Sequence, residues 1–194
     1  NENSPLVSIG VPVFNGEKGL ALALDALLEQ DYSNIEIIIS DNGSTDATPE
    51  ICEEYLNKDS RVKYYRSEEN FGSPWNFTRL FKVSSGKYFM WAAHDDIREL
   101  SFVSACVSKM EQYPEAALCQ THTAMFIEGR KEMLCDVNLD SFEGVTGLVE
   151  RYRETLNHFP ATAMYGLFRS SLMRKTRLFE AVIATDLAFI QELS

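Results

Sequence analysis

Between about residues 6 and 112, short apolar runs alternate with amphipathic stretches of helical period. The run Ile35–Ile39 is almost continuously apolar and β-branched, which is typical of a central parallel strand covered on both faces. Strict alternation of this kind predicts the α/β class: a mainly parallel central sheet flanked by helices, with right-handed crossovers and a Rossmann-like first half. The expected strands of this half are residues 6–14, 35–40, 61–65 and 88–93, each followed by a helix.

The alternation stops after residue 112, and the second half is more irregular. A chain of 194 residues fits one α/β domain or slightly more. We therefore expect a single domain over residues 1–194. The elements expected in its second half are strands over 116–127, 132–137 and 164–168 and helices over 145–156 and 187–193.

The charge of the chain excludes some partners. A net charge of -11 without any Lys/Arg cluster argues against nucleic acid, which needs a basic footprint, and against binding to anionic lipid. No apolar run reaches the about 18 residues of a membrane span. If the substrate is itself an anion, such as a nucleoside diphosphate, a metal ion must help to receive it. The alternative is that the acidity only serves solubility.

The cysteines and the first residues of the chain indicate the cellular compartment that we expect for the protein. The four cysteines include no C-x-x-C pair, so a zinc site is not expected, and all four are compatible with a reducing compartment. The segment Asn1–Pro5 is polar and lacks the features of a signal peptide. These observations predict a cytoplasmic protein. Contact with the inner face of a membrane would then require parts that are not present in this chain.

Acidic side chains follow two of the expected strands. Asp41 comes directly after strand 35–40, and Asp95 and Asp96 come after strand 88–93. In open α/β sheets, ligands bind outside the carboxyl ends of the strands. Two carboxylates at that place suit Mg²⁺ or Mn²⁺, which prefer oxygen ligands and often bridge to substrate phosphates. The alternative is that Asp95 and Asp96 only open a loop and cap the next helix.

Several nucleotide-binding and hydrolytic chemistries are excluded by missing motifs. There is no G-x-x-x-x-G-K-[ST] and no G-x-S-x-G, and Gly10, Gly16 and Gly19 do not form G-x-G-x-x-G. A nucleotidyltransferase is poorly supported because its Gly-rich N-terminal loop is absent. Acids at strand ends without a covalent nucleophile fit a metal-assisted displacement at a phosphate-bearing carbon.

A set of short motifs resembles glycosyltransferase family 2 in order and spacing. The resemblance is close over residues 6–100 and looser over 160–194, where it rests on Gly166–Arg169 and Thr185–Asp186. The motifs of the first part are V-P-V-F-N-G (11–16), Q-D-Y (30–32), I-I-I-S-D-N-G-S-T-D (37–46), N-F-G (70–72), G-K-Y (86–88) and H-D-D (94–96).

The resemblance implies an inverting enzyme with the GT-A fold. About residues 6–100 would form the nucleotide-sugar-binding half, and about residues 101–194 the acceptor-side half. Because family members usually continue with a segment that closes the acceptor site, the resemblance also implies a domain truncated at its C-terminus.

The resemblance also assigns donor contacts. Pro12, Val13 and Phe14 would line the nucleotide base, and Asp41 would accept the imide N–H of uracil or thymine. A UDP- or dTDP-linked sugar would then be the donor. Arg79 would meet the diphosphate. Two alternatives stay open: Asp41 only starts the turn that follows it, and Arg79 lies on a solvated helix face.

The family's metal motif is D-x-D or a variant of it. Here Ala93 replaces the first acid of the common form. The resemblance therefore nominates Asp96 for Mn²⁺ or Mg²⁺, and Asp95 for the metal or for the sugar and ribose of the donor. His94 is expected to pack or to form hydrogen bonds, with metal ligation as the alternative.

The family's general base is a carboxylate near the start of a late helix. The pattern A-T-D-L-A-F nominates Asp186, with an N-cap aspartate as the alternative. The function implied is transfer of a sugar to a glycan, lipid-linked or protein acceptor in glycan or cell-surface polysaccharide synthesis. A catalytically silent nucleotide-sugar-binding domain of the same fold is the competing interpretation, and Ala93 favours it.

Overall fold

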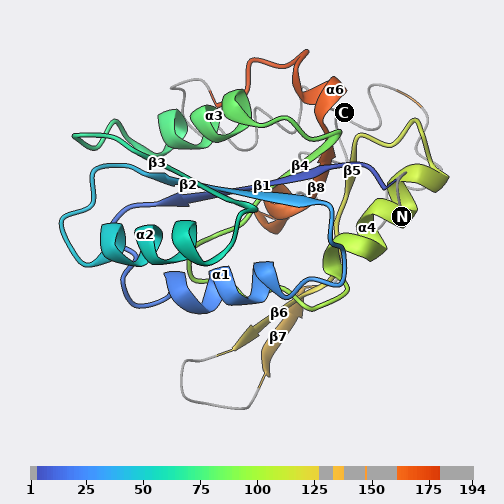
Figure 1. Cartoon of the computed structure of the whole chain (residues 1–194). Coiled ribbons are helices and arrows are strands. Elements are labelled where there is room, and N and C mark those ends of the chain that lie inside the picture. The colour runs from blue at the N-terminus through green and yellow to red at the C-terminus, as the bar shows by residue number, and fades with distance from the viewer. Residues whose placement is uncertain (1–3, 127–132, 138–146, 148–160, 180–194) are drawn as a thin grey trace.

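A six-stranded sheet with the order β3-β2-β1-β4-β8-β5 forms the centre of the structure (Figure 1). The computed structural model describes residues 4–126, 133–137, 147 and 161–179. The first four strands in chain order are parallel, as predicted, and β8 is antiparallel to both β4 and β5. The strands are β1 (Val7–Val13), β2 (Ile35–Asp41), β3 (Val62–Arg66), β4 (Tyr88–Trp91), β5 (Leu118–Cys119) and β8 (Leu167–Arg169).

Helices cover both faces of this sheet (Figure 1). One face carries α1 (Leu20–Leu28), α2 (Thr48–Lys58) and α4 (Phe102–Gln112), and the opposite face carries α3 (Ser73–Val83) and the short α6 (Ser170–Met173). The alternation of strands and helices along the chain therefore produces the layered arrangement that the sequence predicted.

The core consists of two apolar clusters separated by the sheet. Because successive side chains of a strand point to opposite faces, Ile37 and Ile39 enter the cluster under α1, α2 and α4, while Ile38 enters the cluster under α3. All three side chains are fully buried. The continuous apolar run of β2 thus reflects a strand that helices cover on both faces of the sheet.

The second half departs from the expected elements. The strand expected over 116–127 is two strands, β5 and β6 (Thr123–Phe126), and β6 pairs with β7 (Met133–Val137) in an antiparallel hairpin. The strand expected over 164–168 is confirmed only at its end: residues Ala161–Tyr165 form a 3₁₀ helix, and the strand is β8, which begins at Leu167. A short apolar run does not distinguish the two conformations.

The turn between these elements occurs at Gly166, where an added Cβ would lie 2.6 Å from the Leu118 side chain. The helices expected over 145–156 and 187–193 lie outside the described residues. Among the helices in the described ranges, none combines the length and apolar character needed to cross a membrane.

A buried carboxylate ties three strands together at the end of the sheet where β2 begins. Glu36 accepts hydrogen bonds from Ser8 Oγ at 2.5 Å, Lys63 Nζ at 2.5 Å, and Ser85 N and Oγ at 2.9 and 2.8 Å. Burial by itself would raise the pKa of Glu36, but these four donors together lower that pKa to about 2. The ionised carboxylate therefore stabilises the folded chain.

We expect the Glu36 contribution to depend on pH. Its side chain is 7% exposed, and its pKa falls from 4.5 to about 2 on folding, so the stabilisation is present above pH 4.5 and is lost as the pH falls toward 2. It corresponds to about 3 kcal/mol at neutral pH. Glu36→Gln should lower the free energy of urea unfolding at pH 7 by an amount of that order. The exposed Glu115→Gln is the matched control, and equal stability of both variants at pH 7 would contradict the assignment.

Candidate functional site

The strand order reverses between β1 and β4, and acidic residues gather at that point. The two strands are parallel neighbours, with Gly10 opposite Trp91, but the chain continues from β1 to β2 on one side and from β4 toward β5 on the other side. Such a switch point opens a crevice at the carboxyl ends of the strands. The segments that follow β1 and β4 meet there.

Close backbone contacts bring these two segments together. A Cβ added at Gly19, just before α1, would lie 3.1 Å from both Cα and Cβ of Asp95. A Cβ added at Gly16 would lie 2.7 Å from the ring of His94. The Asp95 backbone therefore packs against the start of α1, and the His94 ring packs against the turn after β1, in line with the packing role expected for it.

The two carboxylates of this crevice are accessible. Asp95 and Asp96 are both exposed, and Asp96 Oδ2 lies 3.7 Å from Nη1 of Arg98. The Arg98 side chain is largely buried, with its guanidinium carbon 5.3 Å from the Phe102 ring centroid and 5.9 Å from that of Tyr165. Burial lowers the pKa of Arg98, and its Nε and Nη2 have no hydrogen-bond partner among the described residues.

Arg98 is a residue that the sequence analysis missed. The available signal was a cationic residue two positions after the acid pair, in a loop that leads to α4. Its guanidinium supplies a positive charge next to Asp96, so this carboxylate has a resident counter-ion.

The acid pair fits a hard divalent cation that keeps part of its water shell. Within the described ranges, no group of three His, Cys, Asp or Glu residues could hold a metal ion. Mg²⁺ and Mn²⁺ are often bound through one or two carboxylates plus substrate phosphates, so a dedicated protein cage is not required. Asp95 and Asp96 can supply such oxygens, whereas Ala93 cannot.

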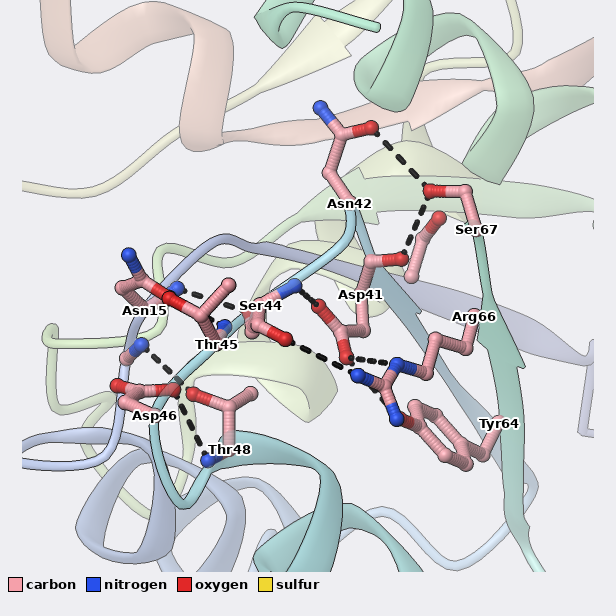
Figure 2. A network of polar contacts seen from close by, with 12 residues as sticks. Asn15, Asp41, Asn42, Ser44, Thr45, Asp46, Thr48, Tyr64, Arg66 and Ser67 are labelled. Atoms are coloured by element: carbon pink, nitrogen blue, oxygen red, sulfur yellow. Dashed lines mark hydrogen bonds and ion pairs between the residues drawn. The ribbon is translucent and has the colours of Figure 1, made fainter. Parts of the chain in front are cut away.

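Asp41, at the end of β2, lies in a dense polar network (Figure 2). It is fully buried: its Oδ1 accepts a hydrogen bond from Ser44 N at 2.8 Å, and its Oδ2 accepts one from the Tyr64 hydroxyl at 3.1 Å. Arg66 Nε lies 3.4 Å from Oδ2, and Arg66 Nη2 donates to Ser44 O at 3.0 Å. Burial raises the pKa of Tyr64, and the negative charge of Asp41 raises this pKa further.

This network bears on both interpretations of Asp41. The contact with Ser44 N shows that Asp41 does start the turn after β2. A nucleotide base that reaches the carboxylate must share it with Arg66 or displace Arg66. Because the Arg66 side chain is half exposed, it is a partner that can move into solvent.

The segment after β1 joins the same network. Pro12 and Val13 are buried within β1, and the partly exposed Phe14 follows them. Asn15 has φ 55°, a left-handed conformation that asparagine tolerates, and its N–H donates to Ser44 Oγ at 2.8 Å. Among the three residues expected to line a base, Phe14 has the exposed side chain.

The contacts of the Arg79 side chain are with aromatic rings and not with the acid pair. Its guanidinium carbon is 5.0 Å from the Trp75 ring centroid and 5.6 Å from that of Tyr65, on the side of the sheet covered by α3. Its Nη1 is buried, and no residue in the part of the chain that the structure describes accepts a hydrogen bond from it. Asp186, the expected general base, lies outside the described residues.

The parallel sheet and the switch point with its acids define a nucleotide-sugar-transferase type of α/β domain, the GT-A fold. The model of the family Glycosyl transferase family 2 matches residues 8–176. The chain therefore belongs to glycosyl transferase family 2, which confirms the resemblance drawn from the motifs.

Individual relatives agree with this assignment. Glycosyltransferase GlyG of Streptococcus pneumoniae is 32% identical over 109 residues, which cover 56% of this chain and 36% of GlyG. Residues 1–349 of S. aureus TarS in complex with UDP-GlcNAc superpose with a TM-score of 0.71 at 21% identity, over 96% of this chain and 52% of that fragment. Mannosyltransferase PcManGT from Pyrobaculum calidifontis, in complex with GDP-Man and Mn²⁺, gives 0.69 at 16% identity, over 97% of this chain and 52% of PcManGT. The chain thus spans about a third to a half of the length of these proteins.

Proposed function

We propose that this chain forms the donor-binding and catalytic domain of an inverting glycosyltransferase that uses a UDP- or dTDP-linked sugar. The observation that carries the proposal is the exposed pair Asp95–Asp96, packed against the start of α1 at the switch point between β1 and β4. Family membership supports transferase chemistry. The ligands of two structural neighbours, UDP-GlcNAc in TarS and GDP-Man with Mn²⁺ in PcManGT, support a nucleotide-sugar donor and a metal ion.

In this proposal the base lies between the ends of β1 and β2. The exposed ring of Phe14 offers a stacking surface, with Pro12 and Val13 fixing its backbone. Asp41 accepts a hydrogen bond from the imide N–H of uracil or thymine. For this, Arg66 either shares the Asp41 carboxylate with the base or moves away from it. A contact of Arg79 with the diphosphate stays a prediction, and its guanidinium lies over the Tyr65 and Trp75 rings.

The acid pair would bind the metal ion that contacts the diphosphate of the donor. Asp96, with Asp95, would hold Mn²⁺ or Mg²⁺, which neutralises the charge that develops on the leaving diphosphate. The acceptor hydroxyl oxygen forms a bond to the anomeric carbon from the opposite face, and the bond from that carbon to the diphosphate oxygen breaks with its electron pair. Asp186 takes the hydroxyl proton. The acceptor is a glycan, a lipid-linked glycan or a protein.

A silent nucleotide-sugar-binding domain is the second candidate. Two observations favour it: Ala93 stands where the metal motif has an acid, and Arg98 already places a cation 3.7 Å from Asp96. Hydrolysis of the donor with added Mn²⁺ separates the two candidates. Turnover supports the transferase, and binding without turnover supports the silent domain.

The metal assignment predicts that Asp96→Asn removes the Mn²⁺-dependent part of thermal stabilisation by uridine diphosphate. A neutral amide is a poor replacement for a charged ligand beside a diphosphate, and the exposed position of Asp96 leaves the core intact. Melting temperatures with uridine diphosphate, with and without Mn²⁺, give the readout. The exposed Asp31→Asn serves as the control, and an unchanged metal-dependent shift in Asp96→Asn would refute the assignment.

The base assignment predicts that Asp41→Ala weakens uridine diphosphate binding by about 1.5–3 kcal/mol, the scale of a hydrogen bond to a charged group. Tyr64→Phe is the matched control, because it removes a partner of Asp41 but keeps the acceptor. Titration calorimetry should give nearly wild-type affinity for this control. Equal wild-type affinity for guanosine and uridine diphosphates would count against the role of Asp41.

The catalytic assignment predicts that Asp186→Asn lowers sugar transfer by about 10²–10⁴-fold, the usual share of general-base catalysis. Asparagine keeps the size and capping capacity of aspartate but cannot take a proton. Donor affinity should stay nearly unchanged, which separates loss of catalysis from loss of folding. Transfer rates should be measured in the full-length protein, and a wild-type rate there would place the base elsewhere.

A further inference from the structure

An open groove lies between the loop after β3 and helix α3. Its volume is about 710 Å³, and it lies outside the crevice that holds Asp95 and Asp96. Two large aromatic side chains meet in it, with Phe71 51% exposed and Trp75 38% exposed. The groove is lined by Arg66, Ser67, Glu68, Glu69, Phe71, Trp75 and Arg79.

The aromatic side chains form a continuous platform. The ring centroids of Phe71 and Trp75 are 4.8 Å apart at an interplanar angle of 38°. The Arg79 guanidinium lies over Trp75 and also faces the exposed ring of Tyr65, which extends the platform toward β3. Adjacent large rings at a surface are typical of a binding site, because their exposure to water is unfavourable.

The loop that carries Phe71 is held in place by the end of β2. Asn42 Nδ2 donates to Gly72 O at 3.1 Å, and Asn42 Oδ1 accepts from Phe71 N at 3.1 Å. Ser67 N donates to the Asp41 carbonyl oxygen at 2.9 Å. Gly43, at φ 79°, lets the loop approach so closely that an added Cβ would lie 2.7 Å from its backbone. The groove is thus preformed, which lowers the entropic cost of binding a ligand.

The charges of the groove indicate an uncharged ligand. Glu68 and Glu69 face the same groove as Arg66 and Arg79, and Arg66 is already 3.4 Å from the Asp41 carboxylate. Without excess positive charge, the groove is a poor site for a phosphate or an anionic lipid surface. The carboxylates and the Ser67 hydroxyl can instead accept hydrogen bonds from hydroxyl groups.

We propose that this groove is a carbohydrate-binding subsite that takes a neutral pyranose ring of a glycan. The apolar C–H face of the ring would stack on Phe71 and Trp75, and its hydroxyls would meet Glu68, Glu69 and Ser67. The subsite does not include Asp95 or Asp96, although it shares Arg66 with the network around Asp41, and it holds a glycan chain beside the domain. It does not depend on whether the crevice transfers a sugar.

Trp75 itself provides the readout, because the other tryptophan of the chain, Trp91, is fully buried. The probes are cellopentaose, tetra-N-acetylchitotetraose and mannotetraose, each up to about 10 mM, the range of weak single-site affinities. At least one of them should protect Trp75 fluorescence from acrylamide quenching in a saturable manner. By titration calorimetry, Phe71→Ala and Trp75→Ala should weaken binding of that oligosaccharide by about tenfold.

The control variant is Tyr113→Ala, which removes an exposed aromatic residue after α4 and should leave binding unchanged. Melting temperatures of all three variants exclude unfolding as the cause. The proposal is overturned if no oligosaccharide protects Trp75, if uridine diphosphate alone protects it, or if Tyr113→Ala weakens binding equally. None of these outcomes affects the Mn²⁺-dependent readout at Asp96, so the subsite and the donor site can fail independently.

Discussion

Parallel hydrogen bonding of β1 to β2 on one side and to β4 on the other is the constraint on which the functional site depends. It places the carboxyl ends of three strands at one edge of the sheet. The segments that follow these strands carry Phe14, Asp41 and the pair Asp95–Asp96. Segments more than 50 positions apart in the chain therefore meet at this edge, and the glycines at 16 and 19 allow the close approach of His94 and Asp95.

Two buried carboxylates brace this arrangement at opposite ends of β2. Glu36 is held by donors from β1, β3 and the segment before β4, and Asp41 by donors from its own turn and from β3. A buried charge is costly unless it is well partnered, so each carboxylate favours the one strand arrangement that supplies its partners. At the Asp41 end, Figure 2 shows Ser67, which directly follows β3, hydrogen-bonded to Asp41 and Asn42.

Much of the first half could be predicted from local pattern. Alternating apolar runs and amphipathic stretches indicated four parallel strands with helices between them, and the motifs from Val11 to Asp96 indicated the family. The second half was less predictable. The run around Met164 and Tyr165 contains no periodicity that separates a strand from a 3₁₀ helix, and pairing of β8 with β4 and β5 decides the outcome there.

The sequence by itself determined the fold class, the family and which carboxylates stand at strand ends, because these follow from periodicity and from short-range motifs. Only the tertiary structure decided what each side chain meets. It showed that Arg66 shares the Asp41 carboxylate and that Arg98 lies beside Asp96. It also brought Phe71 and Trp75 together beside Arg79. Such contacts depend on how loops pack across the edge of the sheet, and local sequence does not encode those distances.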